Sequence, residues 1–157
     1  MIEQIYIYFT IEMIFMWLNI GVLPFWLMLI IFPQSQICKV FITSIFPIFI
    51  LSLVYGYLLY IFFNEDYNFI RNFELYLGLD AVSDLFKNKA FIILFWLHFL
   101  AINLFCGGWI VKDSQKFGIN KIIISIPLLI IYFVGPIGLT IYWVIKIFYA
   151  KKINLYD

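Results

Sequence analysis

Charged side chains are scarce in this chain of 157 residues, which has 10 lysines and arginines and 9 aspartates and glutamates, 12% of the residues in all. Hydrophobic residues make up 66%. A chain of this length encloses too little interior to bury so much apolar surface. The composition therefore excludes a soluble globular protein, and we expect a single domain whose solvent is the lipid bilayer.

Cysteine and histidine are also scarce, with two cysteines and one histidine in the whole chain. Cys38 and Cys106 do not form a C-x-x-C motif, and His98 has no second histidine to share a metal with. This argues against a disulfide framework and a structural metal site, and we expect no cofactor. The net charge of +1 gives no basic field, so nucleic acid is not expected as a partner.

Long apolar runs are what the sequence does have, at about residues 5–32, 40–63, 90–111 and 122–145. Each run is long enough to cross a hydrocarbon core of ~30 Å at ~1.5 Å per residue. Within the polar connection between the second and third runs, the spacing predicts a short amphipathic helix at about 74–87, lying in the membrane interface. The predicted fold is an all-α membrane protein, one four-span domain over residues 1–157.

The fourth run is interrupted by Gly135-Pro136-Ile137-Gly138. Backbone groups freed by such a break must find partners at membrane depth, so we expect it to face protein or a cavity. Four spans would put both termini on one side, together with six of the basic residues against four on the other. The positive-inside rule then favours cytoplasmic termini, and we expect an integral protein of a bacterial inner membrane.

Polar side chains inside the first and third runs are the candidate site, because ionisable and polar groups at membrane depth tend to be functional. Counting from the start of each run places Glu12 level with His98, and Asn19 level with Asn103. A desolvated carboxyl and an imidazole suit proton transfer near neutral pH, so we expect Glu12 and His98 to be catalytic. The two amides would orient a ligand by hydrogen bonding.

Each of these residues also has a structural explanation. A Glu12–His98 pair would satisfy two costly groups, and the two asparagines could hold helices together. Trp96 and Trp109 are either interface anchors or platforms for a ring-ended ligand. Asp113 either caps the end of the third run or pairs with Lys112 or Lys116. The sequence leaves these alternatives open.

One set of motifs resembles the ABA4-like family of small integral membrane proteins, whose plant members are associated with making neoxanthin from violaxanthin. The resemblance covers most of residues 19–146, and its most specific part is the third run. The matching residues are Asn19, Leu23-Pro24-Phe25-Trp26, Pro33, Leu85-Phe86, Trp96-Leu97-His98, LAINLFCGGW ending at Trp109, Asp113, Gly118-Ile119 and Gly135 to Leu139. The resemblance implies that Trp26 and Asp113 also bind the ligand.

Two departures from the family pattern bear on activity. Asn103 stands where the family generally has Asp, and Gly108 where it often has Arg. The resemblance implies end-group isomerisation of a carotenoid-like lipid, from epoxide to allene, without a cofactor. Asn103 cannot exchange a proton, which favours a non-catalytic pigment-binding or assembly subunit. A small transporter or channel is the third hypothesis, and a homo-oligomer or larger membrane complex is left open.

Overall fold

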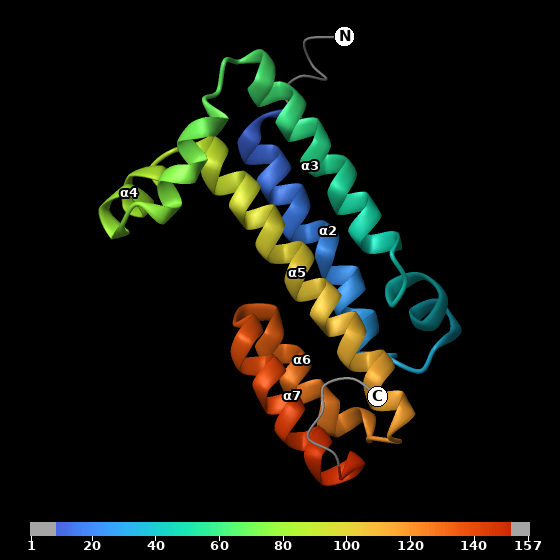
Figure 1. Ribbon diagram of the computed structural model, residues 1–157. Helices are drawn as coiled ribbons and strands as arrows, with labels where there is room; N and C mark the ends of the chain where they lie inside the picture. The colour runs from blue at the N-terminus through green and yellow to red at the C-terminus, as the bar shows by residue number, and fades with distance from the viewer. Residues whose placement is uncertain (1–8, 152–157) are drawn as a thin grey trace, which may run out of the picture. The chain divides into compact units, whose positions relative to one another are not determined.

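A computed structural model describes residues 9–151 and shows helices joined by turns (Figure 1). No strand occurs within these residues, which confirms the all-α prediction. The elements, in chain order, are α2 (Ile11–Ile31), the π-helical turn η2 (Cys38–Ile42), α3 (Phe46–Asn64), the 3-10 helix η3 (Phe69–Tyr76), α4 (Leu79–Leu85), α5 (Lys89–Lys116), α6 (Lys121–Phe133) and α7 (Gly135–Ala150).

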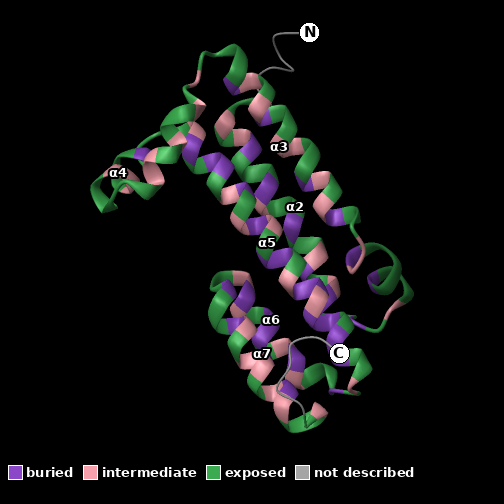
Figure 2. Ribbon diagram, in the orientation of Figure 1, coloured by how far each residue is buried: buried purple, intermediate pink, exposed green. Residues whose placement is uncertain are grey.

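Three of these helices are long and apolar enough to cross a membrane. They are α2, α3 and α5, with 21, 19 and 28 residues, and at ~1.5 Å per residue each reaches about 30 Å or more. Figure 2 shows exposed positions over much of α3, and among them are the large apolar side chains of Phe49, Leu53 and Phe63. Large apolar side chains on an outer surface fit a lipid environment.

The structure does not confirm the fourth span. The predicted single helix at 122–145 is broken at Val134, whose backbone leaves the helical region at φ −140° and ψ 85°. The two resulting helices have 13 and 16 residues, about 20 and 24 Å, and each is shorter than the hydrocarbon core. Figure 1 shows α6 and α7 side by side, so residues 121–150 form a helical hairpin.

Close packing holds the two helices of this hairpin together. A Cβ added to Gly138 on α7 would lie 2.7 Å from the carbonyl oxygen of Pro127 and 2.6 Å from the backbone nitrogen of Ile131, both on α6. Only glycine allows two helix backbones to approach so closely. Gly135 and Gly138 are both buried, whereas Phe133, Val134 and Ile137 are exposed, so only the glycine side of the break faces protein, and the prediction that the whole break does so is not confirmed.

The polar connection between α3 and α5 does not form the single helix that was predicted at 74–87. Gly78, at φ 144°, separates η3 from the seven residues of α4, so two short helices replace one. An exposed ion pair links Lys87 to Asp84, and the ammonium holds the pKa of the Asp84 carboxyl below its usual range. Ile70, Phe73 and Leu79 are all exposed. Location in the membrane interface stays a prediction, which these exposed apolar side chains support.

The described chain forms two compact units. Unit 1 contains residues 9–21 and 50–100, and unit 2 contains residues 22–49 and 101–151, so α2, α3 and α5 each contribute to both. Each unit has buried apolar side chains of its own, for example Leu58 and Leu97 in unit 1, and Leu29 and Leu128 in unit 2. The prediction of a single domain stays a prediction.

Candidate functional site

The predicted contact between Glu12 and His98, both in unit 1, is not formed. The Glu12 carboxylate instead accepts a hydrogen bond from the Lys89 ammonium at 2.7 Å, and both side chains are exposed. His98 is exposed on α5, and it makes no hydrogen bond or ion pair to the residues that the structure describes. The Glu12 carboxyl is therefore paired with Lys89 and is not placed to exchange a proton with the His98 imidazole.

Two other predicted site residues of unit 1 contact each other. The indole N–H of Trp96 on α5 donates to Oδ1 of Asn19 on α2 at 3.1 Å, and the Asn19 amide donates to the carbonyl of Phe15 at 2.7 Å. Trp96 also stacks on Phe99, with ring centroids 5.2 Å apart. Asn19 and Trp96 therefore join α2 to α5, which is the structural alternative for Asn19, whereas Trp96 was expected to be an interface anchor or a ligand platform. A binding role for them stays a prediction.

Trp26 is a core residue of unit 2. It is 3% exposed and packs edge to face against Tyr132, with ring centroids 5.5 Å apart. Gly107 makes room for it, since a Cβ there would lie 2.9 Å from the indole ring. The Gly107 position thus explains why a large side chain of α2 can approach α5 so closely.

Asn103 is buried in unit 2, where it meets the turn between α6 and α7. It is 5% exposed, and a Cβ added to Gly135 would collide with its Oδ1. Its amide nitrogen has no hydrogen-bond partner among the residues described. The hairpin turn therefore lies beside the middle of α5, and it leaves one buried donor unsatisfied.

Asp113 has partners that sequence reasoning missed. Its Oδ2 lies 2.9 Å from the Lys146 ammonium and accepts a hydrogen bond from the Tyr142 hydroxyl at 2.7 Å, so the predicted pairing with Lys112 or Lys116 is wrong. Asp113 is 5% exposed and Lys146 1% exposed. Lys146 also lies 5.7 Å from the ring of Trp109, which packs edge to face on Tyr142.

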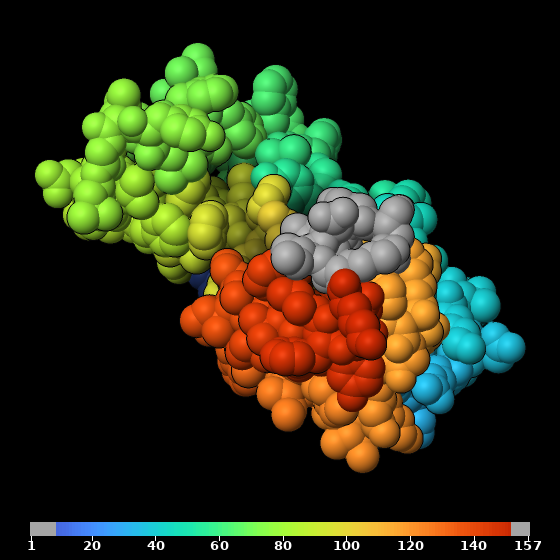
Figure 3. All heavy atoms as spheres, turned by 60° about the horizontal axis from the view of Figure 1, so that its bottom comes forward, coloured from blue at the N-terminus to red at the C-terminus, as the bar shows by residue number. Residues whose placement is uncertain are grey.

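This cluster of Asp113, Tyr142 and Lys146 ties the end of α7 to the C-terminal part of α5. In the space-filling view the red surface of α7 adjoins the orange surface of the preceding part of unit 2 (Figure 3). Tyr142 and Lys146 are four residues apart and so lie on one face of α7. A single helix at 122–145 would have carried Lys146 to the opposite membrane surface from Asp113. The pairing could be found only once the break at Val134 was known to reverse the chain.

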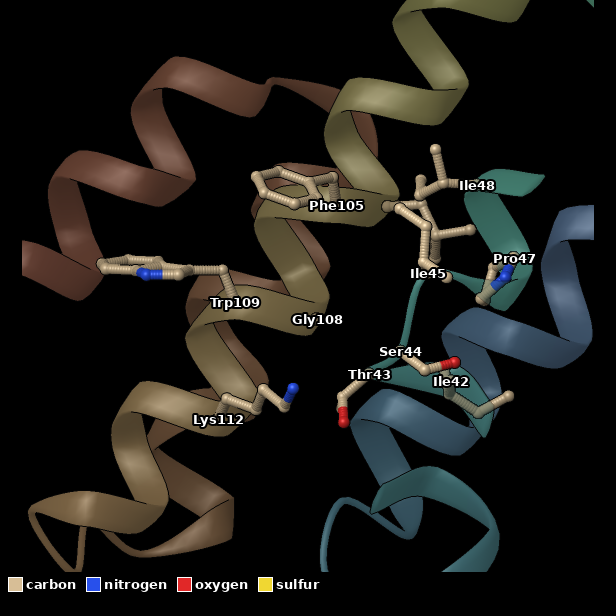
Figure 4. A pocket seen from close by; sticks show the side chains of 11 residues that line it. Ile42, Thr43, Ser44, Ile45, Pro47, Ile48, Phe105, Gly108, Trp109 and Lys112 are labelled. Carbon is tan, nitrogen blue, oxygen red and sulfur yellow. The ribbon is translucent and has the colours of Figure 1, made fainter. Parts of the chain in front are cut away.

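A pocket of about 290 Å³ lies in unit 2, beside the C-terminal half of α5 (Figure 4). It is amphipathic, because Lys112, Thr43 and Ser44 lie at one end while Phe105, Ile45 and Ile48 lie at the other. The full lining is Ile42, Thr43, Ser44, Ile45, Pro47, Ile48, Leu104, Phe105, Gly108, Trp109 and Lys112. The sequence analysis selected only Trp109 of these as a binding residue, although the adjacent Gly107 and Gly108 signalled a close approach to α5.

The polar end of this pocket can hydrogen-bond to a ligand oxygen. The Thr43 hydroxyl donates to the carbonyl of Lys39 at 3.0 Å and the Ser44 hydroxyl to that of Phe41 at 2.6 Å, so their protons are engaged. Lys112 forms no ion pair within the described chain, and its ammonium is the free donor. Gly108 keeps the wall open, since a Cβ there would meet only Ile42 O and Thr43 Cα, both at 3.7 Å.

The described part of the chain offers no cluster for a metal ion, and Cys38 is not suited to act as a nucleophile. No three His, Cys, Asp or Glu side chains gather there to hold a metal ion. Cys38 is completely buried, and burial raises the pKa of its thiol to about 11, which keeps it protonated and unreactive.

The fold and the site define a small protein, all-helical in its described residues, with three apolar helices long enough to cross a bilayer and an amphipathic pocket. The chain belongs to the ABA4-like (ABA DEFICIENT 4-like) family, whose model matches residues 13–142. It is 27% identical over 122 residues to Protein ABA DEFICIENT 4, chloroplastic, of Arabidopsis thaliana.

That alignment covers 76% of this chain and 54% of the relative, so the chain spans about half the length of the curated relative that it matches. The relative is a chloroplast protein, which gives no support to the expected bacterial inner membrane. No solved structure matches this chain.

Proposed function

We propose that this protein binds a carotenoid-like apolar lipid, with one end group of the ligand in the pocket beside α5. The amphipathic lining carries the proposal: a hydroxyl or epoxide oxygen would meet the Lys112 ammonium, while the ring would lie against Phe105, Ile45 and Ile48. A volume of about 290 Å³ is near the low end for ligand pockets and suits one cyclic end group rather than a whole pigment. Membership of the ABA4-like family supports a carotenoid-related ligand.

Filling the pocket should abolish this binding. Gly108→Leu adds a side chain to the pocket wall, and its Cβ meets only van der Waals contacts at 3.7 Å. We expect pigment retained per protein to fall at least about tenfold, as for loss of ~1.4 kcal/mol or more of binding energy. The measurement is absorbance of protein purified from cells that accumulate one carotenoid with oxygenated rings.

The matched control is Gly56→Leu, because Gly56 lies on α3 with nothing within 4 Å of its missing Cβ. It should retain the wild-type amount of pigment. Equal retention by both variants would remove this pocket from ligand binding, and equal loss would show a general effect of adding leucine to a helix.

A second candidate function is conversion of the bound lipid, with His98 as the proton carrier. One observation favours it: the imidazole is exposed on α5 and has no partner in the described residues, so a ligand dissolved in the bilayer can reach it. Glu12, the expected acid, is engaged in an ion pair with Lys89, and the Asn103 amide cannot donate a proton in its place. Binding without turnover therefore stands first.

His98→Ala distinguishes the two functions. If the protein converts its ligand, this variant should lose at least about 100-fold in product, the usual contribution of a positioned acid or base. Pigment retained per protein should not change. The measurement is chromatography of the pigments extracted from cells that express each variant. A new pigment formed equally by wild type and His98→Ala would exclude His98 from the reaction.

A further inference from the structure

The hairpin of residues 121–150 reaches about halfway along the transmembrane length beside α5. Its turn, at Gly135, lies against Asn103, whereas its end, at Lys146, lies against Asp113. Ten residues separate these two positions on α5, which is ~15 Å of helix, or half of a core of ~30 Å. Both ends of the hairpin therefore lie at the C-terminal end of α5.

We propose that residues 121–150 form a re-entrant hairpin, and that the membrane side to which it returns is a lysine-rich surface that binds anionic lipid headgroups. With three spans and a re-entrant hairpin, the 32–45 connection, the 117–120 turn and the end of α7 all lie on one side. The N-terminal end of α2 and the 65–88 connection lie on the other. This proposal does not depend on the identity of the ligand in the pocket.

The charges of the two units differ in sign and in pairing. In the described part of unit 2 the only carboxylate is Asp113, and buried Lys146 neutralises it. The other lysines of that part are exposed and form no ion pair with any described residue; they are Lys39, Lys112, Lys116, Lys121 and Lys151. This side therefore carries uncompensated positive charge.

Unit 1 shows the opposite pattern. Its described residues include six carboxylates and three basic side chains, and each of the three bases is paired: Arg71 with Glu74, Lys87 with Asp84, and Lys89 with Glu12. A membrane protein orients the lysine-rich side of its short loops towards the cytoplasm. The hairpin therefore predicts a cytoplasmic C-terminal end and an outer N-terminal end, whereas four spans would put both on one side.

A polar hollow on the lysine-rich side is suited to a headgroup. It has a volume of about 750 Å³ and lies between the end of α2 and the start of α6. Lys39 and Lys121 line it together with the amides of Gln34 and Gln115, while Ile122 adds an apolar, 69% exposed wall. Two ammonium groups beside an apolar wall match a phosphate attached to acyl chains, because lysines near a membrane surface are attracted to anionic lipids.

Labelling of single cysteines tests the topology. Three single-cysteine variants are made in a Cys38→Ala/Cys106→Ala background: Asn120→Cys, Lys151→Cys and Asn88→Cys. Each variant is treated with a membrane-impermeant maleimide in sealed vesicles. Full labelling in detergent confirms that each thiol can react. We expect positions 120 and 151 to be labelled from one side and position 88 from the other. Labelling of 151 together with 88 would overturn the hairpin.

Reconstitution tests the lipid surface. The thermal midpoint of the wild-type protein should rise when phosphatidylglycerol is added to phosphatidylcholine vesicles, and the rise should shrink at high salt, which screens exposed charges. Lys39→Gln/Lys121→Gln should lose at least half of the rise. The control Arg71→Gln/Lys87→Gln removes the same number of charges from unit 1 and should keep it.

Three results would overturn the lipid proposal: no rise with phosphatidylglycerol, the same loss in both double variants, or an equal rise when inorganic phosphate is added to vesicles of phosphatidylcholine alone. The last result would assign the hollow to a free anion rather than to a lipid.

Discussion

Asp113→Ala is expected to lower the free energy of unfolding by about 3–5 kcal/mol, because it removes the carboxylate that lies 2.9 Å from the buried Lys146 ammonium. Lys146 is 1% exposed, and the same substitution also removes the acceptor of the Tyr142 hydroxyl. A loss of this size is a large part of the stability of a small protein. The measurement is the unfolding midpoint of the purified protein in detergent.

An exposed ion pair provides the matched control. Asp84→Ala breaks the pair with Lys87, in which both side chains are largely exposed, and the unfolding midpoint should stay close to that of the wild type. Replacing both buried partners, as Asp113→Leu/Lys146→Met, should recover most of the stability lost in the single variant, because both buried charges are removed together. Similar midpoints for Asp113→Ala and Asp84→Ala would contradict the buried ion pair.

Gly138→Ala is expected to cost at least about 1–3 kcal/mol, the usual cost of overpacking, although alanine is the better helix former. The added methyl would lie 2.6 Å from the nitrogen of Ile131 and 2.7 Å from the oxygen of Pro127. These are backbone atoms of α6, so no side-chain rotation can relieve the contact, and α6 and α7 must move apart. Thermal unfolding in detergent measures the cost.

Gly56→Ala is the control for Gly138→Ala. Gly56 lies within α3, and nothing lies within 4 Å of its missing Cβ, so alanine should be neutral or should stabilise the helix by up to about 1 kcal/mol. If both alanine variants unfold at the wild-type midpoint, α6 and α7 do not pack as closely as the hairpin requires.

The error in pairing Glu12 with His98 has a simple origin. The sequence put the start of the first span at residue 5, which lies outside the described residues, and the depth of Glu12 was counted from there. Helix α2 begins at Ile11, which places Glu12 in its first turn. Its partner, Lys89, is the first residue of α5, so the two charges meet where both helices begin. Apolar residues before the helix lengthened the predicted span, and depths counted from its start were therefore wrong.

The same counting succeeds once it starts from the helix ends. Asn19 and Trp96 are each about two turns from the start of their helices, and they share a hydrogen bond. The sequence did select both residues, but it assigned them to a ligand rather than to each other. Hydrogen-bonding capacity can be read from a side chain, whereas its partner depends on the rotation of each helix about its axis.

The sequence by itself determined the helical class of this protein and its long apolar runs, three of which form helices long enough to cross a bilayer, because helix length and transfer free energy follow from composition and the order of residues. Only the tertiary structure decided the path of the fourth apolar run. Gly135-Pro136 can kink a helix that continues or can turn the chain back, and both preserve the same apolar pattern. Contacts between distant residues, Gly138 with α6 and Lys146 with Asp113, select the hairpin.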